Sequence, residues 1–476
     1  MKIIKNYLYN VLYQVFTLIV PLITTPYITR VLGSEGVGIN AFTNSVIQYF
    51  ILAGSIGISL YGNRIIAYQR DSRSEMSQTF WSLTLMRILT ITVAYVLFLF
   101  FLAFTKEFKI FYLIQSIQII AAMVDISWLF MGLEDFKKTV LRNFLIKGIS
   151  TIAIFTFVKT DQDIGAYIFI VAFSILIGNV SLWGYLKQVV DKPQLKQLKL
   201  KKHLRGSLTL FIPQVSMQIY LVLNKTMLGS ITGVQSAGFF ENTDKIVKML
   251  LAIVTAIATV MMPRMANTFI HKDYKKLHNY LFQTIDFVSY VSVLMTAGLA
   301  GVAPTFSVWF MGEQFAITGK LIPILSLVCP LISWSTVLGS QYLVTTHQER
   351  KFTISVTAGA IFNFGTNLFL ITKYGVIGAV WATVLSELLV TILDIIFVRD
   401  QVTVKELFSD KWKYIVAGLI TFAVVRSLNN AQAGTFLNLI LQALIGVVTY
   451  GIITILLKSS FIKLVNNMIH SRNTNR

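Results

Sequence analysis

Several charged side chains lie inside long apolar stretches of this 476-residue chain, where ionic groups are rare. The candidate basic residues are Arg30, Arg64, Arg87, Lys147, Lys225, Lys245 and Lys248, and the candidate acidic residues are Asp125, Asp244 and Glu387. A cation at the centre of a bilayer costs roughly 2.5–3.5 kcal/mol, so such residues normally face a protein interior or a hydrated cavity. In the first half of the chain, Arg87 and Lys147 outnumber the one deep acid, Asp125. We therefore expect a positively biased cavity for an anionic, phosphate-bearing substrate, with arginine binding bidentately and lysine as a point charge.

The same charged residues also have simpler structural interpretations, which the sequence leaves open. Lys225 lies close enough to the expected outer end of its helix for its amine to reach the membrane interface. Arg30 and Arg64 stand at helix ends, where interfacial anchors are common, and Glu387 is either a neutral, hydrogen-bonded carboxyl or an ion-coupling site. Six residues could instead neutralise one another in pairs, namely Arg87 with Asp125, Glu241 with Lys245, and Asp244 with Lys248.

Three prolines mark positions where helices could bend. Pro21 and Pro26 lie in the first apolar stretch, and Pro213 lies in the seventh. Proline removes a backbone hydrogen bond and kinks a helix. We expect these positions to act as gating kinks, with static kinks as the alternative.

Other kinds of chemistry are disfavoured by what the chain contains. Cys329 is the only cysteine, so an internal disulfide, a thiolate metal cage and a Cys-x-x-Cys redox pair are excluded. The five histidines fall in expected loops or the tail, and we expect no metal site and no cofactor. No G-x-x-x-x-G-K-[ST] motif occurs, so ATP hydrolysis by this chain is not expected. The basic run between the two halves is not interleaved with aromatic residues, which argues against nucleic-acid binding.

The elements that must position these residues are membrane helices. Hydrophobic residues make up 55% of the chain and charged residues 13%, about half the charged share of a soluble domain. Apolar runs of about 20 residues recur from end to end, each long enough to cross a hydrocarbon core of roughly 30 Å. We predict an all-α integral membrane protein with about fourteen transmembrane helices. Most of the 41 lysines and arginines fall in connections on one side, which predicts that both termini are cytoplasmic.

The apolar stretches repeat. The segment "VLGSEGVGINAFTNSV" (31–46) resembles "MLGSITGVQSAGFFENTDKI" (227–246), with Gly38 matching Gly238, and "DIGAYIF" (163–169) resembles "VIGAVWA" (376–382). Helices 1–6 therefore repeat as helices 7–12 in the same membrane direction, which places a site between two parallel six-helix lobes. The predicted parts are an N-terminal lobe (1–187), a basic cytoplasmic linker (188–206), a C-terminal lobe (207–398), and two further helices with a tail (399–476).

The chain resembles the oligosaccharide repeat-unit flippases (Wzx-type) of bacterial polysaccharide synthesis. The resemblance is carried by "YNVLYQVFTLIVPLITTPYITRVLGSEGVGINAFTNSVIQYF", "GSIGISLYGNRIIAYQRD" (54–71), "FIPQVSMQIYLVLNKTMLG" (211–229), "GFFENTDKI" (238–246) and "YGVIGAVWATVLSE" (374–387). These flippases belong to a superfamily that also contains multidrug exporters and flippases of lipid-linked peptidoglycan precursors. Relatives often carry an acidic residue before the lysine of the helix-7 motif, where this chain has Asn224.

This resemblance implies alternating access by two lobes in the bacterial cytoplasmic membrane. The cargo would be an undecaprenyl-diphosphate-linked oligosaccharide, moved from the inner to the outer leaflet for capsule or exopolysaccharide synthesis. H⁺ or Na⁺ coupling is left open, and the expected partners are membrane lipid, the lipid-linked substrate, a polysaccharide polymerase and glycosyltransferases. The alternative is a multidrug cation antiporter of the same architecture, which should have an acidic cavity, whereas the deep charges here are mostly basic. A membrane polymerase would need a large outer loop, and the sequence predicts none.

Overall fold

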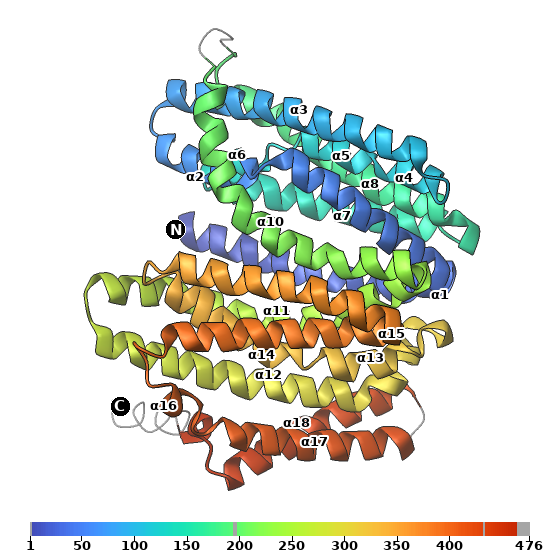
Figure 1. Cartoon of the computed structure of the whole chain (residues 1–476), viewed down its shortest axis with the longest axis vertical. Coiled ribbons are helices and arrows are strands. Elements are labelled where there is room, and N and C mark those ends of the chain that lie inside the picture. The colour runs from blue at the N-terminus through green and yellow to red at the C-terminus, as the bar shows by residue number, and fades with distance from the viewer. Residues whose placement is uncertain (1, 194–197, 432–433, 464–476) are drawn as a thin grey trace. The chain divides into compact units, whose positions relative to one another are not determined.

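The computed structural model describes residues 2–193, 198–431 and 434–463, and every regular element in these ranges is a helix (Figure 1). The chain forms two compact units, Met1–Gly238 and Phe239–Arg476. The expected all-helical membrane fold is confirmed. Nine helices of the described ranges are long and apolar enough to cross a membrane, and a bent pair, Ile19–Ser55 with Ile58–Gln69, adds a tenth.

The first unit is built from ten helices and the start of an eleventh. They are α1 (Lys2–Ser55), α2 (Ile58–Gln69), α3 (Arg73–Phe104), α4 (Lys109–Gln115), α5 (Ile117–Met123), α6 (Ser127–Gly132), α7 (Phe136–Phe157), α8 (Ile164–Ser181), α9 (Leu186–Val189) and α10 (Leu200–Ile231), with 3₁₀ turns at Asp161–Asp163 and Leu182–Tyr185. The fourth apolar stretch of the sequence, residues 109–132, is therefore broken into α4, α5 and α6 rather than continuous.

Helix α1 contains two membrane-crossing stretches. Its 54 residues would extend about 80 Å if straight, far more than a bilayer core of roughly 30 Å. The chain turns back at Gly33, whose backbone has φ 65° and ψ −174° (Figure 1). A side chain at this position would be strained, because positive φ is readily adopted only by glycine.

The core of the first unit depends on close helix packing. Trp128, Phe80 and Leu83 are fully buried in one cluster that joins α2, α3 and α6. Gly62 allows the closest approach, because a Cβ built there would lie 2.5 Å from Cε3 of Trp128. Packing of this kind positions α3, which carries Arg87.

The second unit contains most of α11 (Val234–Ile270) and the helices that follow. They are α12 (Tyr274–Met311), α13 (Thr318–Leu325), α14 (Val328–Ser335), α15 (Glu349–Val398), α16 (Val404–Phe408), α17 (Lys411–Ala431) and α18 (Phe436–Leu456), with a 3₁₀ turn at Glu313–Phe315 and a π-helical segment at Thr336–Leu343. Helix α15 resembles α1 in having two long stretches joined at a glycine, Gly375, with φ 58° and ψ −135°.

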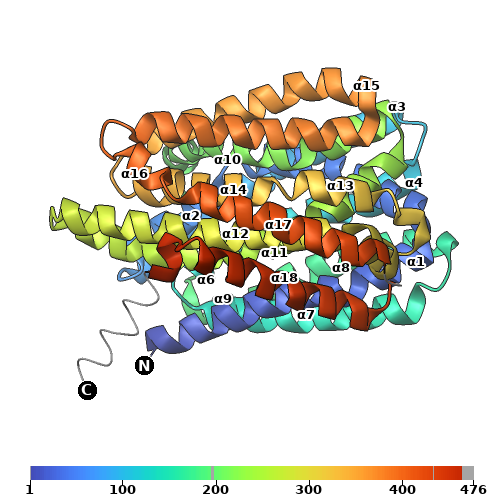
Figure 2. The same ribbon diagram turned by 90° about the horizontal axis from the view of Figure 1, so that it is seen from below.

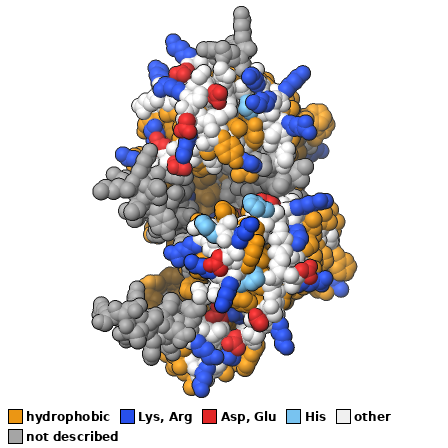
Figure 3. All heavy atoms as spheres, turned by 90° about the vertical axis from the view of Figure 1, so that its left-hand side faces the viewer, with side chains coloured by type: hydrophobic (Ala, Val, Ile, Leu, Met, Phe, Trp, Pro, Cys, Tyr) orange, Lys and Arg blue, Asp and Glu red, His pale blue; other side chains and the backbone are white. Residues whose placement is uncertain are grey.

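Helices α17 and α18 lie side by side and pack against α12 (Figures 1 and 2). Their outer faces are apolar: Leu419, Leu437 and Leu456 are 63%, 65% and 73% exposed. Exposed apolar faces on long helices are expected where lipid is the solvent. Figure 3 shows one end of the helices, where Lys and Arg side chains predominate over Asp and Glu, as expected for a face rich in basic connections.

Two observations bear on the predicted lobes. Helix α10, which the sequence assigns to the second lobe, packs within the first unit against α1, α2 and α3. Gly238 also contacts Gly38, its expected repeat partner, since a Cβ built on Gly238 would lie 2.9 Å from Cα of Gly38. Contact between equivalent positions is expected where two repeats cross at a symmetry axis. The repeat and its boundaries stay predictions.

Candidate functional site

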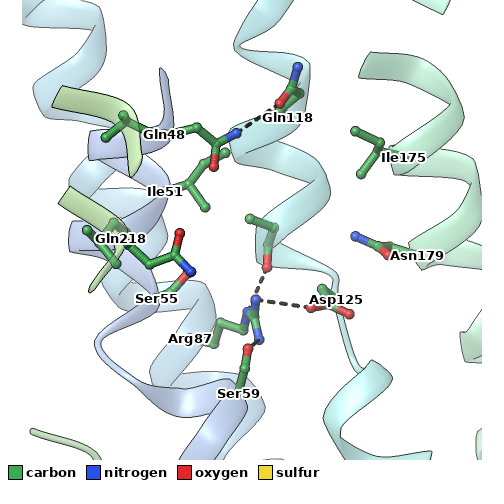
Figure 4. Close-up of a pocket in the computed structure, with 13 residues that line it drawn as sticks. Gln48, Ile51, Ser55, Ser59, Arg87, Gln118, Asp125, Ile175, Asn179 and Gln218 are labelled. Carbon is green, nitrogen blue, oxygen red and sulfur yellow. Dashed lines mark hydrogen bonds and ion pairs between the residues drawn. The ribbon is translucent and has the colours of Figure 1, made fainter. Parts of the chain in front are cut away.

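Arg87 lies on α3 inside the first unit and is only 3% exposed. Its Nε donates to the carbonyl oxygen of Ala122 (2.6 Å), one terminal nitrogen donates to Oγ of Ser59 (3.1 Å), and the other donates to Oδ2 of Asp125 (3.3 Å) (Figure 4). The side chain thus joins α3 to α2 and to the broken fourth span. The ion pair with Asp125, one of the two sequence interpretations, is present.

The break in the fourth span is part of this arrangement. Helix α5 ends at Met123 and α6 begins at Ser127, so Asp125 lies in a non-helical connection. In a continuous helix the carbonyl of Ala122 would accept the amide of residue 126; here it accepts from Arg87 and, more weakly, from the amide of Asp125 (3.4 Å). Oδ1 of Asp125 accepts the amide of Ser127 (2.9 Å). The break therefore supplies two oxygen acceptors to the guanidinium, one backbone and one side chain.

Arg87 and Asp125 line a cavity of about 330 Å³ within the first unit (Figure 4). The other lining residues come from α1, α2, α5, α8 and α10: Gln48, Ile51, Leu52, Ser55, Ser59, Gln118, Ala122, Ile175, Asn179, Gln218 and Val222. This volume is within the range of about 300–1,000 Å³ typical of small-molecule sites. It is large enough for a polar headgroup.

Side-chain amides give the cavity its chemistry. Gln48 donates to Oε1 of Gln118 (3.3 Å), and Asn179 donates to the carbonyl of Ala121 (2.8 Å). An amide carries both donors and acceptors, so it can bind hydroxyl groups in either sense. A guanidinium beside several amides can bind a ligand that combines anionic oxygens with hydroxyls.

A second arginine, Arg142 on α7, reaches the same region through Asn179. One of its terminal nitrogens donates to Oδ1 of Asn179 (3.1 Å) and more weakly to the carbonyl of Gly178 (3.4 Å). This contact, together with the bond from Asn179 to Ala121, fixes the amide orientation at the cavity wall. The sequence placed Arg142 in a basic cytoplasmic connection, and no local pattern distinguished it.

The remaining candidate cations of the first unit lie elsewhere. Lys147 on α7 is half-buried and donates to Oγ1 of Thr17 (3.4 Å). Lys225 on α10 is half-buried, while Arg30 and Arg64 are exposed. Arg30 donates to the carbonyl of Pro26 (2.9 Å), an interaction with its own helix. None of these four lines the cavity of Arg87, and their role in binding stays a prediction.

In the second unit, the candidate charges on α11 form local pairs. Lys248 contacts Asp244 at 2.6 Å, and Lys245 contacts Glu241 at 3.9 Å. These are the i,i+4 pairs that the sequence allowed. Glu387 is half-buried on α15, and its ion-coupling role stays a prediction.

The expected gating prolines do not interrupt α1. The helix continues through Pro21 and Pro26, and its one residue with non-helical dihedrals is Gly33. Pro213 lies in α10, but its side chain falls outside the described residues. The gating role of all three stays a prediction. Within the described ranges no group of three or more His, Cys, Asp or Glu side chains is placed to hold a metal ion.

The second unit also contains a buried ion pair that the sequence did not predict. Asp286 on α12 and Lys411 at the start of α17 form an ion pair with side chains 7% and 8% exposed, and Oδ1 of Asp286 also accepts from Tyr414 (2.8 Å) and Ser460 (2.7 Å). In sequence, Lys411 lies among the basic residues of a predicted cytoplasmic connection. Its partner lies 125 residues away in sequence, so no local spacing could reveal the pair.

Comparisons with known proteins agree with this architecture. A family model described as "Polysaccharide biosynthesis protein" matches residues 3–269, more than half of the chain. The chain is similar to the "Putative O-antigen transporter" of Shigella dysenteriae, with 24% identity over 402 residues that cover 84% of this chain and 99% of that protein. Among solved structures it is similar to the lipid II flippase MurJ in an inward closed conformation (TM-score 0.78, 16% identity, 95% of this chain and 99% of that chain).

An inward-facing multidrug resistance transporter of the MATE family is also similar (TM-score 0.63, 14% identity, 81% of this chain and 95% of that chain). At such identities the two solved structures establish the fold alone. The family match and the Shigella relative confirm the resemblance to repeat-unit flippases that the sequence motifs carry. These relatives are transporters and flippases rather than enzymes.

Proposed function

We propose that this chain, which belongs to the polysaccharide biosynthesis protein family, translocates an undecaprenyl-diphosphate-linked oligosaccharide repeat unit from the inner to the outer leaflet of the bacterial cytoplasmic membrane. The product would serve capsule or exopolysaccharide synthesis. The observation that carries the proposal is the Arg87 guanidinium at the wall of an amide-lined cavity inside an all-helical membrane protein. The names of the relatives, an O-antigen transporter and a lipid II flippase, support the same class of cargo.

Arg87 retains donors for a phosphate. A guanidinium has five N–H groups, and the contacts with Ala122, Ser59 and Asp125 use three of them. The other two would bind diphosphate oxygens when the headgroup enters the cavity. Gln48, Gln118 and similar amides would bind sugar hydroxyls without selecting one sugar strictly, because amide groups both donate and accept.

Transport requires this cavity to open alternately toward the two leaflets. We infer alternating access with both termini cytoplasmic, which the distribution of lysine and arginine supports. H⁺ or Na⁺ would drive the cycle, with Asp125, Asp244 and Glu387 as the candidate coupling residues. Glycosyltransferases would act before this step, and a polymerase would act after it.

A multidrug cation antiporter of the same fold is less well supported. An organic cation needs an unpaired carboxylate or an acidic cavity. Among the residues lining the cavity of the first unit, Asp125 is the one carboxylate, and it is paired with Arg87. The net charge of the lining therefore does not favour a cation.

The test uses the native bacterium with the chromosomal copy deleted and complemented by variants. Arg87→Gln should accumulate lipid-linked repeat units in the membrane, measured by mass spectrometry of lipid extracts, and should lower surface polysaccharide. Because this variant leaves Asp125 without its partner, the double variant Arg87→Gln with Asp125→Asn restores neutrality. Normal protein levels without export in the double variant, with export retained in Asp125→Asn alone, would assign the arginine to the cargo rather than to folding or to loss of the carboxylate.

Arg70→Gln is the matched control. Arg70 forms an exposed ion pair with Glu134 at 3.1 Å, with side chains 46% and 63% exposed, and exposed pairs contribute little. Export should be unchanged in this variant. The proposal is refuted if deletion of the chain leaves lipid-linked repeat units and surface polysaccharide unchanged, and increased sensitivity to organic cations in the deletion strain would favour the antiporter.

A further inference from the structure

A second carboxyl group, Asp394, is completely buried in the second unit and is not among the expected site residues. It lies on α15 one turn before the helix ends at Val398, and its exposed fraction is 0%. Its Oδ2 is 2.7 Å from Oγ of Ser335, and its Oδ1 is 2.6 Å from Oγ of Ser355. The group thus bridges the end of α14 and both stretches of α15.

No cation neutralises Asp394. Within the described ranges, no basic side chain forms an ion pair with it. The elements packed around Asp394 carry the titratable side chains of Cys329, Tyr342, Lys351 and Glu387. The same elements carry four charged residues that are exposed: Lys320, Glu349, Arg350 and Lys373. Lys351 donates to Oε1 of Gln348 (2.8 Å) and to the carbonyl of Phe397 (3.5 Å) instead. An ionised carboxylate buried without a positive partner would be costly.

Two contacts share the hydroxyl group of Ser355. Its Oγ lies 2.6 Å from Oδ1 of Asp394 and 2.9 Å from the carbonyl oxygen of Phe352. A serine hydroxyl has one proton, and a carbonyl oxygen can only accept. If Ser355 donates to Phe352, the short contact with Asp394 requires a proton on the carboxyl group. In that arrangement a neutral Asp394 donates to Ser355 and accepts from Ser335, but a carboxylate that accepts from both hydroxyls fits the same distances, so the neutral state rests on burial without a cation.

The absence of a side chain at Gly339 leaves room for this carboxyl group. Gly339 lies in the π-helical segment, and a Cβ built there would be 3.1 Å from Oδ2 of Asp394 and would overlap the ring of Phe352. Any larger residue would therefore displace the carboxyl group or the ring. π-helical segments are rare and occur frequently at functional sites.

A cavity lies beside the two ends of α15. It has a volume of about 380 Å³ and is lined by Phe269, Tyr274, Leu277, His278, Tyr342, Thr346, Gln348 and Gln401. Gln348 accepts from Lys351, which is one turn from Ser355, and Gln401 lies just beyond the end of the helix that carries Asp394.

We propose that Asp394 is a proton-binding site that couples H⁺ movement to transport, protonated in this conformation and deprotonated in another. Protonation moves one H⁺ from water to Oδ1, and release returns it when the hydroxyls of Ser335 and Ser355 no longer enclose the carboxyl group. The coupling rests on the proposed function, whereas proton binding itself does not.

The first experiment measures proton binding in the purified, detergent-solubilised chain by infrared difference spectroscopy. A carboxyl C=O band that appears on acidification should be lost in Asp394→Asn and remain in Asp191→Asn, whose carboxylate forms an exposed pair with Arg73. Asp394→Asn should fold as well as the unsubstituted chain, because an amide can also donate to Ser355 and accept from Ser335. Absence of a band that this substitution removes overturns the proposal.

The second experiment measures coupling in cells that carry Asp394→Asn, Asp394→Glu or the unsubstituted chain. Export of lipid-linked repeat units should depend on the pH gradient in the unsubstituted chain, lose that dependence in Asp394→Asn, and regain part of it in Asp394→Glu. Export in Asp394→Asn that is still abolished by a protonophore overturns the coupling role. If the unsubstituted chain exports no repeat units, the proposed function fails, while the infrared band still decides whether Asp394 binds a proton.

Discussion

The ion pair between Asp286 and Lys411 should be the strongest single polar link between α12 and the last two helices. Its side chains are 7% and 8% exposed, so solvent screening does not weaken it. Oδ1 of Asp286 accepts hydrogen bonds from Lys411, Tyr414 and Ser460. Oδ2 is buried with no hydrogen-bond partner in the described ranges. Lys411→Met removes the cation paired with Asp286 and leaves a buried carboxylate with two hydroxyl donors.

Removing one partner of a buried ion pair costs about 3–5 kcal/mol, because the remaining charge stays uncompensated. Tyr414 and Ser460 continue to stabilise the carboxylate, so we expect a loss near the lower limit, about 3 kcal/mol in the free energy of unfolding. The double variant Asp286→Leu with Lys411→Met removes both charges. Its loss should be smaller than that of Lys411→Met alone, because replacing a buried pair by apolar residues is often neutral or stabilising.

The assay is a double-mutant cycle on the purified chain in detergent micelles, with unfolding followed by SDS titration. The exposed pair of Arg73 with Asp191, at 2.9 Å and with side chains 53% and 54% exposed, is the matched control and should show little coupling. A loss below about 1 kcal/mol for Lys411→Met, or a double variant as unstable as the single one, would refute the reasoning. Either result would mean that the pair is hydrated in the folded chain.

Two further predictions follow from packing and from pH. Gly38→Ala should lower the free energy of unfolding by about 1–3 kcal/mol, because its Cβ would overlap the carbonyl oxygen of Val234. Gly148→Ala is the control and should leave the free energy of unfolding unchanged, because no atom lies within 4 Å of the added Cβ. SDS titration of both variants measures the difference. Burial, with a smaller contribution from nearby lysines, lowers the pKa of His203, which contacts Tyr61 through Nδ1 at 3.1 Å. The folded state then binds fewer protons than the unfolded state, so the free energy of unfolding should fall as pH drops below about 6.5. Unfolding titrations at about pH 7.5 and about pH 5.5 measure this fall, and His203→Gln should remove it.

The sequence predicted the helices, because they follow from long apolar runs that recur along the chain. Long apolar runs predicted helices, and the pairing of Arg87 with Asp125 could be anticipated because both residues are deep in neighbouring spans. The break at Asp125 could not, because no glycine or proline marks it. The break leaves the carbonyl oxygen of Ala122 and the carboxylate of Asp125 as acceptors for Arg87. Arg87 lies 35 positions earlier in the sequence than Ala122. A local sequence signal is absent where a tertiary contact replaces a helical hydrogen bond.

The missed residues share one physical property: their partners are distant in sequence. Lys411 resembles an ordinary basic residue at a helix end until α17 packs against α12 and encloses it. The role proposed for Asp394 depends on Ser335 and Ser355, which are 59 and 39 residues away. Serine is common in membrane helices, so neither position is distinctive by itself. Only the fold brings the two hydroxyls to one carboxyl group.

The pairing of Arg87 with Asp125 has a consequence for how a diphosphate could bind. The pair is neutral as a unit, so attraction for an anion depends on the donors that remain on the guanidinium. Asp125 is the more exposed partner, at 20% against 4%, and faces the cavity that a headgroup would enter. An arriving phosphate would therefore repel Asp125 while it binds Arg87, and the repulsion is relieved if the carboxyl group turns away. Substrate entry would then break the ion pair that joins α3 to the broken fourth span.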